Sequence, residues 1–449
     1  MRVIGTLLLT LSSVTPASSV FVIVPGVLQQ SGTGAFLSML AAALLSFPIA
    51  FVYAELASAF PISGGEYCML GRTLGPAWGF AMVGLILIGN MLTPAVLALG
   101  AGVYIGAVFP GLNGTFVAIA IIVATTILAI LHVRTNAWVT GIFLLLEILA
   151  LLVLAGLGFF HVARPLSALV LHPVALAGGA LYPTPLALIG LSTAVSVFAY
   201  YGFSSAVYFT EEMHEAPRLI GRTILWAMLI TVLTELVPVA AVLLGASDLK
   251  SLLASPSPFS DFVRATGGSM LNAAISLSVA LAIVNAVLAT LLQNARFLFS
   301  TGRDRAWHGL INDVFTRTHV RFRSPWGATL AAGVSSIVMC FLGLKLLLVI
   351  TGTGIVLTYA GVCWAALAGR RNGSSAHAVF RMKFFPLLPV VGLLALAYIL
   401  YTSWLDPDIG RPSLIVNFAV IAFSLGYYIL VLRSRGGWVL RDPEEDPLP

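Results

Sequence analysis

The sequence predicts an all-α integral membrane protein with twelve transmembrane helices. Of its 449 residues, 59% are hydrophobic and only 9% are charged, whereas a soluble protein carries roughly 25% charged residues. The apolar runs are continuous over about 20 residues, as a membrane-spanning helix requires. They do not alternate as the strands of a membrane barrel do. The lipid bilayer is therefore the expected environment of the chain.

Twelve apolar runs are separated by polar connectors. The first run is too long for a removable signal peptide and lacks a small-residue cleavage pattern, so we expect it to remain in the protein. The tail from Arg433 to Pro449 ends in DPEEDPLP, and this acidic, Pro-rich composition is typical of a disordered segment. The predicted spans are 3–28, 34–60, 77–109, 114–131, 137–159, 186–210, 219–245, 268–300, 325–343, 346–368, 384–404 and 412–432.

The basic residues are unevenly distributed across this topology. Most of the 23 Lys and Arg residues lie in the termini and the even-numbered turns, and the opposite side holds Arg164, Lys250, Arg264, Lys345 and Arg411. Because Lys and Arg collect in cytoplasmic loops, both termini are predicted to be cytoplasmic. We expect a multi-pass protein of the cell membrane, specifically a bacterial inner membrane. The same asymmetry explains the net charge of +6 without a nucleic-acid partner.

The first span contains an unusually polar segment, Ser12–Phe21, with the sequence SSVTPASSVF. Pro16 removes a backbone donor and disfavours helical geometry at Thr15. Unpaired backbone at mid-membrane is tolerated only when it is buried in protein or lines a cavity. The segment is therefore either a broken helix that holds a polar solute or a kinked helix whose hydroxyl groups bond to its own carbonyls.

A second interruption lies in the sixth span, where Gly202 is flanked by Tyr201 and Phe203. Glycine permits unwinding at low steric cost. The two interrupted spans are five spans apart, and an odd offset reverses the direction of a helix in the membrane. Paired interruptions of this kind indicate an inverted-repeat transporter with a site near the bilayer midplane. Core packing of Tyr200 and Tyr201 is the alternative explanation.

Four stretches resemble the amino acid–polyamine–organocation (APC) superfamily of secondary transporters. The most specific is Tyr53–Pro76, YAELASAFPISGGEYCMLGRTLGP, which is similar to the end of the family's second span. ASSVFVIVPG (Ala17–Gly26) resembles the signature GSGIF-x-x-PG with one extra residue, and Ala-Ser-Ser after Thr-Pro replaces its Gly-Ser-Gly. Phe198–Glu212 resembles the sixth span, and Asn294–Trp307 resembles the end of the eighth. The resemblance covers about residues 1–370.

The resemblance implies a leucine-transporter-like (LeuT-like) fold. Its two five-helix inverted repeats, with broken helices 1 and 6, would occupy residues 1–159 and 186–368. Two peripheral helices would occupy 384–432, and a cytoplasmic tail 433–449. The solute would lie between the two broken spans, where free backbone donors match a carboxylate and free carbonyls match an ammonium group.

The resemblance also implies which residues contact the solute. Carboxylate contacts would come from Ala17, Ser18 and Ser19. Ammonium contacts would come from the region of Val14, Thr15, Phe198 and Ala199. Tyr200 or Tyr201, beside Gly202, would close over the solute as an aromatic gate. The expected site residues are thus Thr15, Ala17, Ser18, Ser19, Phe198, Ala199, Tyr200, Tyr201 and Gly202.

Ionisable residues inside spans are costly and are functional candidates by default. Glu147 lies in the middle of the fifth span without a nearby charge. It could carry a coupling proton, bind Na⁺, or bond to the backbone of the first span as a structural acid. For Glu235, in the seventh span before Pro238, a structural role is the favoured interpretation. Glu55 and Glu66, near the cytoplasmic side, are expected to join a charge network with loop arginines.

Other polar and sulfur-containing residues have simpler expected roles. Asn90, Asn285, Gln293 and Asn294 are typical of hydrogen bonding between helices, and Thr351 could line the pathway. Cys68, Cys340 and Cys363 are far apart and are expected to pack in the interior. No nucleotide-binding, metal-binding or hydrolytic motif is present, so we expect no catalytic residue, metal site or cofactor beyond a coupling H⁺ or Na⁺.

The sequence therefore predicts a secondary active transporter, not an enzyme, that moves amino acids by alternating access, as a monomer or homodimer. Symport and exchange both remain open, as do proton and sodium coupling. One alternative is a transporter of polyamines or other organic amines such as putrescine. The absence of a carboxylate in the two broken segments favours a neutral amino acid over such a dication. A non-transporting amino acid sensor is a further alternative.

Overall fold

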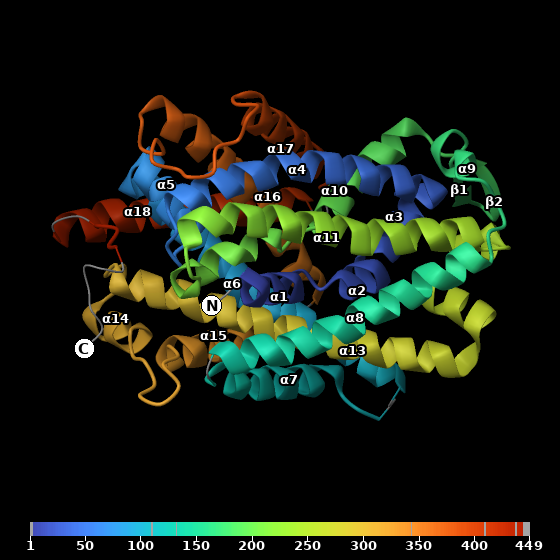
Figure 1. The fold of residues 1–449 in the computed structure, drawn as a ribbon, viewed down its shortest axis with the longest axis horizontal. Coiled ribbons are helices and arrows are strands. Elements are labelled where there is room, and N and C mark those ends of the chain that lie inside the picture. The colour runs from blue at the N-terminus through green and yellow to red at the C-terminus, as the bar shows by residue number, and fades with distance from the viewer. Residues whose placement is uncertain are drawn as a thin grey trace.

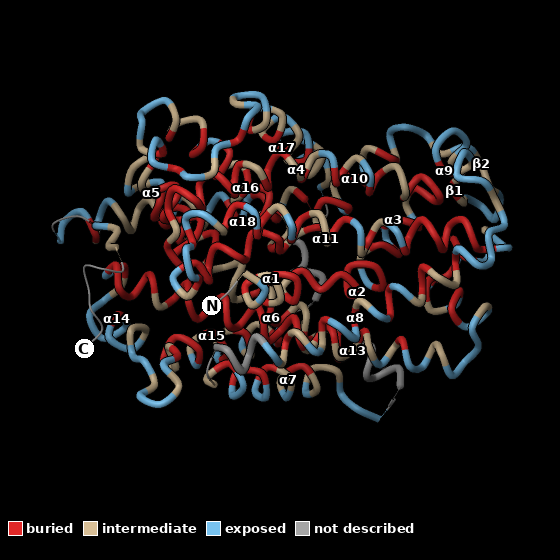
Figure 2. Tube along the Cα trace, in the orientation of Figure 1, coloured by how far each residue is buried: buried red, intermediate tan, exposed pale blue. Residues whose placement is uncertain are grey.

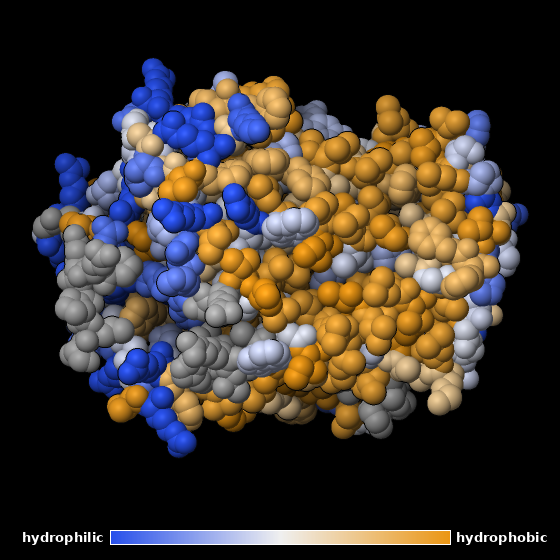
Figure 3. Space-filling view, viewed as in Figure 1, coloured by the Kyte–Doolittle hydropathy of each residue, from blue (hydrophilic) through white to orange (hydrophobic). Residues whose placement is uncertain are grey.

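The computed structural model describes residues 3–108, 111–131, 133–342, 344–407, 410–435 and 438–442. Long helices run along the longest dimension of the molecule, side by side (Figure 1). Apolar side chains cover the middle of the visible face, and polar side chains gather at both ends (Figure 3). Among the described residues, nine helical stretches are long and apolar enough to cross a membrane, and two shorter apolar helices accompany them. The prediction of an all-helical membrane protein is confirmed.

Each predicted span contains one or more helices, and non-helical residues interrupt the first span at Thr15 and the sixth at Tyr200–Gly202. The first half of the chain forms α1 (Val3–Val14), α2 (Pro16–Ser18), η1 (Ser19–Ile23), α3 (Val24–Ser31), η2 (Gly32–Gly34), α4 (Ala35–Ala59), α5 (Glu66–Leu74), α6 (Pro76–Val108), α7 (Gly114–Ala129), α8 (Val133–Phe160) and α9 (Ser167–Val170).

The second half begins with a short hairpin and continues as helices. It forms β1 (Val174–Ala177), β2 (Ala180–Pro183), α10 (Leu186–Ala199), η3 (Phe203–Glu212), α11 (Ala216–Gly245), α12 (Leu249–Ala254), α13 (Pro258–Arg303), α14 (Gly309–Phe315), α15 (Trp326–Met339), α16 (Leu344–Arg371), α17 (Leu387–Leu405), α18 (Gly410–Tyr427), η4 (Tyr428–Leu432) and η5 (Arg433–Arg435).

Burial distinguishes the core helices from the outer ones. In the most apolar part of α13, 72% of the residues are buried inside the protein. In the corresponding parts of α17 and of Gly410–Arg435, only 22% and 17% are buried. Buried backbone gathers around α1 and α2, in the interior of the bundle (Figure 2). The polar first span is thus surrounded by protein, which satisfies the condition for irregular backbone at membrane depth.

The hairpin β1–β2 was not predicted from the sequence. Its strands pair antiparallel, with Ala177 opposite Ala180, across Gly178 and Gly179. Both glycines have positive φ, at 57° and 77°, which a two-residue hairpin turn requires and which only glycine adopts without strain. The Thr33 hydroxyl contacts both backbone groups of Val174, so the hairpin covers the turn between α3 and α4.

The opposite end of the molecule, called the α5 end below, carries α5, α14 and the last described residues (Figure 1). Two described residues of the predicted tail pack against this end. Trp438 is buried against Tyr67 and Phe80, and Asp442 pairs with Arg72 at 2.7 Å. Residues 443–449 of the predicted tail lie outside the described residues.

The two acids expected in a charge network have different partners. Glu55 receives two hydrogen bonds of 2.6 Å from Arg370, which confirms its pairing with an arginine. Glu66 instead accepts hydrogen bonds from two tyrosines, Tyr53 at 3.0 Å and Tyr208 at 2.5 Å. Gly65, with φ 65°, begins α5 in a geometry that turns Glu66 inward. Burial raises the pKa of Glu66, while the hydrogen bonds from Tyr208 and Tyr53 oppose the shift.

Candidate functional site

The first helix is broken at Thr15. This residue adopts a left-handed conformation, φ 49° and ψ 70°, between α1 and α2, and Pro16 begins α2. Pro16 has no N–H group, and the next donor, the N–H of Ala17, bonds to Glu147 Oε1 at 2.7 Å. The Thr15 hydroxyl donates to the same oxygen at 3.1 Å. Glu147, on α8, thus satisfies a backbone donor that the break leaves outside the helical pattern.

The segment that follows is a π-helical turn, η1, from Ser19 to Ile23. The N–H of Val24 bonds to the carbonyl of Ser19, five residues earlier. Such turns accommodate one extra residue within a helix and occur frequently at functional sites. The extra residue noted in Ala17–Gly26 is therefore absorbed without interrupting the helix a second time.

The second break lies between α10 and η3. Gly202 has φ 116°, a region that side-chain-bearing residues rarely adopt. A Cβ atom added to Gly202 would lie 2.9 Å from Val14 Cα. The two breaks therefore contact one another directly, and glycine is the residue that permits this approach.

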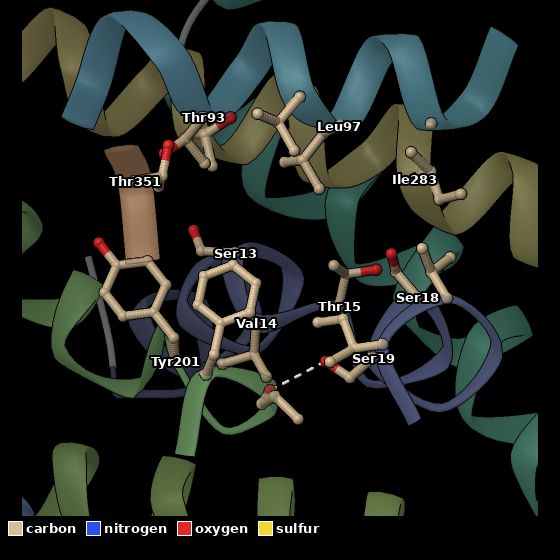
Figure 4. A pocket seen from close by; sticks show the side chains of 18 of the residues that line it. Ser13, Val14, Thr15, Ser18, Ser19, Thr93, Leu97, Tyr201, Ile283 and Thr351 are labelled. Carbon is tan, nitrogen blue, oxygen red and sulfur yellow. Dashed lines mark hydrogen bonds between the residues drawn. The ribbon is translucent and has the colours of Figure 1, made fainter. Parts of the chain in front are cut away.

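A hydrogen bond joins the two broken helices beside this contact. The Ser19 hydroxyl, at the start of η1, donates to the carbonyl of Ala199, the last residue of α10, at 2.9 Å. Figure 4 draws this bond as a dashed line at the edge of a cavity. The bond satisfies a carbonyl that the end of α10 leaves without a helical partner.

The cavity has a volume of about 110 Å³ and lies between the two breaks and helices α6, α13 and α16 (Figure 4). No Asp, Glu, Lys, Arg or His is found among the described residues that line it. Its wall combines hydroxyl and amide groups with aliphatic side chains. The lining residues are Ser13, Val14, Thr15, Ser18, Ser19, Val22, Ile23, Asn90, Thr93, Val96, Leu97, Gly100, Phe198, Ala199, Tyr201, Gly202, Ile283, Thr290, Gln293, Asn294 and Thr351.

Most of the predicted site residues meet at this cavity. Those that line it are Thr15, Ser18, Ser19, Phe198, Ala199, Tyr201 and Gly202. Ala17 is not part of the lining, because its N–H is directed to Glu147. Tyr200 is also outside it and fully buried. Glu147 lies behind the wall formed by Thr15, not in the wall itself.

Of the two adjacent tyrosines, Tyr201 lines the cavity and Tyr200 does not. The Tyr201 ring stacks on Phe198 with centroids 6.4 Å apart and an angle of 6° between the planes. Tyr201 also lines a second cavity of about 30 Å³, toward the α5 end, which includes Glu66 and Tyr359. Asn90, Thr93 and Thr351 also line both cavities, so Tyr201 is one of four described residues at their shared boundary.

Polar contacts join several elements at the α5 end. Arg303, near the end of α13, pairs with Glu211 of η3 at 3.0 Å. Arg296 pairs with Glu212 at 2.8 Å. Tyr67 of α5 donates to Asp304 at 2.8 Å. These bonds tie the second broken helix to α13, and α5 to the residue that follows α13.

The sequence reasoning underestimated the helices opposite the breaks. Asn90, Gln293 and Asn294 were assigned to contacts between helices, and Thr93 and Thr290 were not selected, yet all of them line the cavity. Asn294 fulfils both descriptions, since it also donates to the Asn90 carbonyl at 2.5 Å. The sequence feature that could have identified these five residues was the occurrence of polar side chains within apolar spans.

Comparison with known proteins shows the family of the chain. The amino acid permease family model matches residues 2–431. The chain is 23% identical to the branched-chain amino acid permease BcaP of Bacillus subtilis over 440 residues, covering 93% of this chain and 89% of that protein. It is 24% identical to the methylthioribose transporter of the same organism, covering 92% and 89% of the two chains.

A mammalian relative shares the same region. The chain is 24% identical to cationic amino acid transporter 4 of Mus musculus, covering 83% of this chain and 60% of that protein. The family match extends over the helices that carry both breaks and the cavity between them. The chain therefore belongs to the amino acid permease family.

Proposed function

We propose that this protein is a secondary active transporter that moves neutral amino acids across a bacterial inner membrane by alternating access. The observation that carries the proposal is the uncharged cavity bounded by the breaks of two helices. Family membership supports transport of an amino acid as the general activity. The ion pairs that tie the second broken helix to α13 at the α5 end support a cycle in which these contacts break and form again.

The proposal includes twelve membrane crossings in a LeuT-like arrangement. The stretch Val3–Ala59 has 57 residues and would extend about 86 Å as one helix at 1.5 Å per residue, far more than one crossing needs. It reverses at Gly32–Gly34 and supplies two crossings, and the shorter helices α7 and α15 each supply one more. The breaks after α1 and α10 would belong to inverted repeats at 1–159 and 186–368.

The proposed orientation places the α5 end in the cytoplasm, together with both termini. Arg303, Arg370 and Arg371 lie toward this end, consistent with the collection of basic residues on the cytoplasmic side. Helices α17 and α18 would be the peripheral pair, which agrees with their low burial.

The wall of the cavity favours a neutral amino acid with an aliphatic side chain. Val96, Leu97 and Ile283 supply an apolar surface opposite the breaks. The solute's carboxylate would face Ser18 and Ser19, and its ammonium group would face the carbonyls near Thr15 and Ala199. A dication such as putrescine finds no carboxylate among the described lining residues. The branched-chain amino acid permease among the relatives supports this substrate class.

Coupling to H⁺ or Na⁺ is assigned to Glu147. Its Oε1 atom binds the backbone at the first break, while Oε2 is buried without a hydrogen-bond partner among the described residues. A change in its charge would alter the strength of its bonds to Thr15 and Ala17, because bonds to a charged acceptor are stronger. Cation binding at Glu147 would thereby affect the segment that lines the cavity.

Reconstitution tests the function directly. Purified protein in liposomes should accumulate radiolabelled neutral amino acids under an imposed proton or sodium gradient, and it should not accumulate putrescine. Exchange of internal for external amino acid distinguishes a transporter from a sensor, which would bind without exchange. Uptake of polyamines in preference to amino acids would overturn the substrate assignment.

A further inference from the structure

Glu235 is a second carboxyl group in the interior of the bundle, on α11. Its exposed fraction is 0%, and neither carboxyl oxygen has a hydrogen-bond partner among the described residues. Helix α11 packs against α4, α8, α1, η3, α2 and η1. Glu235 does not line the cavity, and the proposed transport function does not use it.

The groups around Glu235 belong to both broken helices. The Ser19 hydroxyl lies beside its carboxyl group. The titratable groups that face it are Glu147 from α8 and Tyr200 at the end of α10. The Tyr200 hydroxyl is itself buried without a partner in the described chain. Neither Glu235 nor Glu147 forms an ion pair with a described Lys, Arg or His.

An ionised carboxylate without a partner is very unfavourable in such surroundings, so the group must bind a proton or recruit a donor. Ser19 supplies a donor beside the carboxyl group, but it has a single hydroxyl hydrogen, and that hydrogen is directed to the Ala199 carbonyl at 2.9 Å. A protonated Glu235 can donate its own hydrogen to Ser19 Oγ and leave the Ser19–Ala199 bond intact. A deprotonated Glu235 competes for the same hydroxyl hydrogen.

We propose that Glu235 is a second proton-binding site, which controls the hydrogen bond between Ser19 and Ala199 and thereby the connection between the two broken helices. When the proton leaves through the cavity, the Ser19 hydroxyl turns from Ala199 to the carboxylate. The Ala199 carbonyl is then free to face the cavity. When a proton returns, the bond between the helices forms again. No other reactant is required.

The consequence for transport rests on the function proposed above. A free Ala199 carbonyl is an additional acceptor for an ammonium group in the cavity. Deprotonation of Glu235 should therefore strengthen substrate binding and loosen the contact between the breaks. Protonation should have the opposite effect. The assignment of the proton site itself does not depend on the identity of the substrate.

The first experiment follows the proton without substrate. Infrared titration of the purified full-length protein should show the carbonyl band of a protonated buried carboxyl group, and this band should disappear in Glu235→Gln. Glu215→Gln, which alters an exposed acid next to Arg218, is the matched control and should retain the band. An unchanged band in Glu235→Gln would overturn the proton site.

The second experiment measures the link to the breaks. Leucine affinity, measured by scintillation proximity in detergent, should rise with pH by at most about tenfold per pH unit for one linked proton. The leucine affinity of Glu235→Gln and of Ser19→Ala should change by less than about twofold over the same pH range. Gln donates a hydrogen bond at every pH, and Ala has no hydroxyl group to transmit the change. A wild-type pH profile in Ser19→Ala would overturn the proposed control of the Ser19–Ala199 bond.

The two proposals fail in different ways. If no amino acid binds or is transported, the function is wrong, and the infrared titration still decides the proton site. If leucine is transported with the same pH profile in wild type and Glu235→Gln, the function stands and the role of Glu235 is wrong. Retention of the infrared band in Glu147→Gln separates Glu235 from the neighbouring acid, and its loss there would overturn the assignment.

Discussion

Glu147 Oε1 accepts a hydrogen bond of 2.7 Å from the backbone N–H of Ala17, although 130 residues separate them in the chain. The bond ties α8 to the first break, where Pro16 leaves the helical pattern incomplete. A structural role and a coupling role are therefore compatible in Glu147, because the same carboxyl group supports the break and can change its charge.

Glu147→Gln tests the coupling part of this role. The Gln side chain keeps an oxygen acceptor for Ala17 and Thr15 but loses the negative charge, so folding should be retained. Uptake in liposomes should lose its dependence on the imposed proton or sodium gradient, while exchange in the absence of a gradient persists. Transport with unchanged gradient dependence would show that Glu147 is purely structural.

Gly202→Ala tests the contact between the two breaks. The added Cβ would lie 2.9 Å from Val14 Cα, and a left-handed conformation costs a non-glycine residue about 1–2 kcal/mol. We expect a lower melting temperature and strongly reduced uptake. Gly26→Ala is the matched control, because no atom lies within 4 Å of its added Cβ. Equal effects of the two substitutions would argue against a tight contact at Gly202.

Tyr201 is expected to act as the ring that closes the cavity. Tyr201→Ala removes the stacking on Phe198, so the apparent KM for leucine should rise by up to about tenfold, in proportion to the roughly 0.5–1.5 kcal/mol that an aromatic contact supplies. Tyr201→Phe preserves the ring and should keep KM within about threefold of wild type. If Tyr201→Ala transports like wild type, closure depends on another residue.

Asp304 provides a test based on pH and stability. It follows α13, and burial raises the pKa of its carboxyl from 3.8 to about 6, although Arg303 opposes the shift. Since the folded state then binds the proton more tightly than the unfolded state, the contribution of Asp304 to stability is full below about pH 4 and is lost as pH rises through about 6.

Asp304→Asn should remove this dependence. The melting temperature of the variant relative to wild type should rise between pH 4 and pH 7, because the variant lacks the charge that burial penalises. Asp313→Asn, at an exposed pair with Arg305, is the control and should show a smaller pH dependence. A difference between Asp304→Asn and wild type that does not vary with pH would contradict the assigned cause.

The sequence was sufficient for the helices and for the positions of both breaks. Continuous apolar length defines a span regardless of its neighbours, and Pro16 and Gly202 disturb helical geometry by their own covalent structure. Contacts that depend on tertiary packing were harder to predict. Glu66 was assigned to arginines but bonds to Tyr53 and Tyr208, since the turn at Gly65 directs it inward.

The choice between Tyr200 and Tyr201 illustrates the same limit. Helical periodicity ends at Ala199, so sequence spacing no longer determines which side chain faces the cavity. Packing determines it instead, with Tyr201 on Phe198 and Tyr200 in the interior. Whether the lining residues bind the solute stays a prediction.

The π-helical turn from Ser19 to Ile23 has a consequence for how this chain tolerates deletion. Removing one residue from a regular helix rotates everything beyond it by about 100° and shifts it by about 1.5 Å. Here, loss of Val20 would convert the wide turn into an ordinary α-helical one, and α3 would keep its direction and its outward face. We therefore expect a variant without Val20 to fold, whereas a single deletion within α4 would turn the buried face of that helix toward lipid.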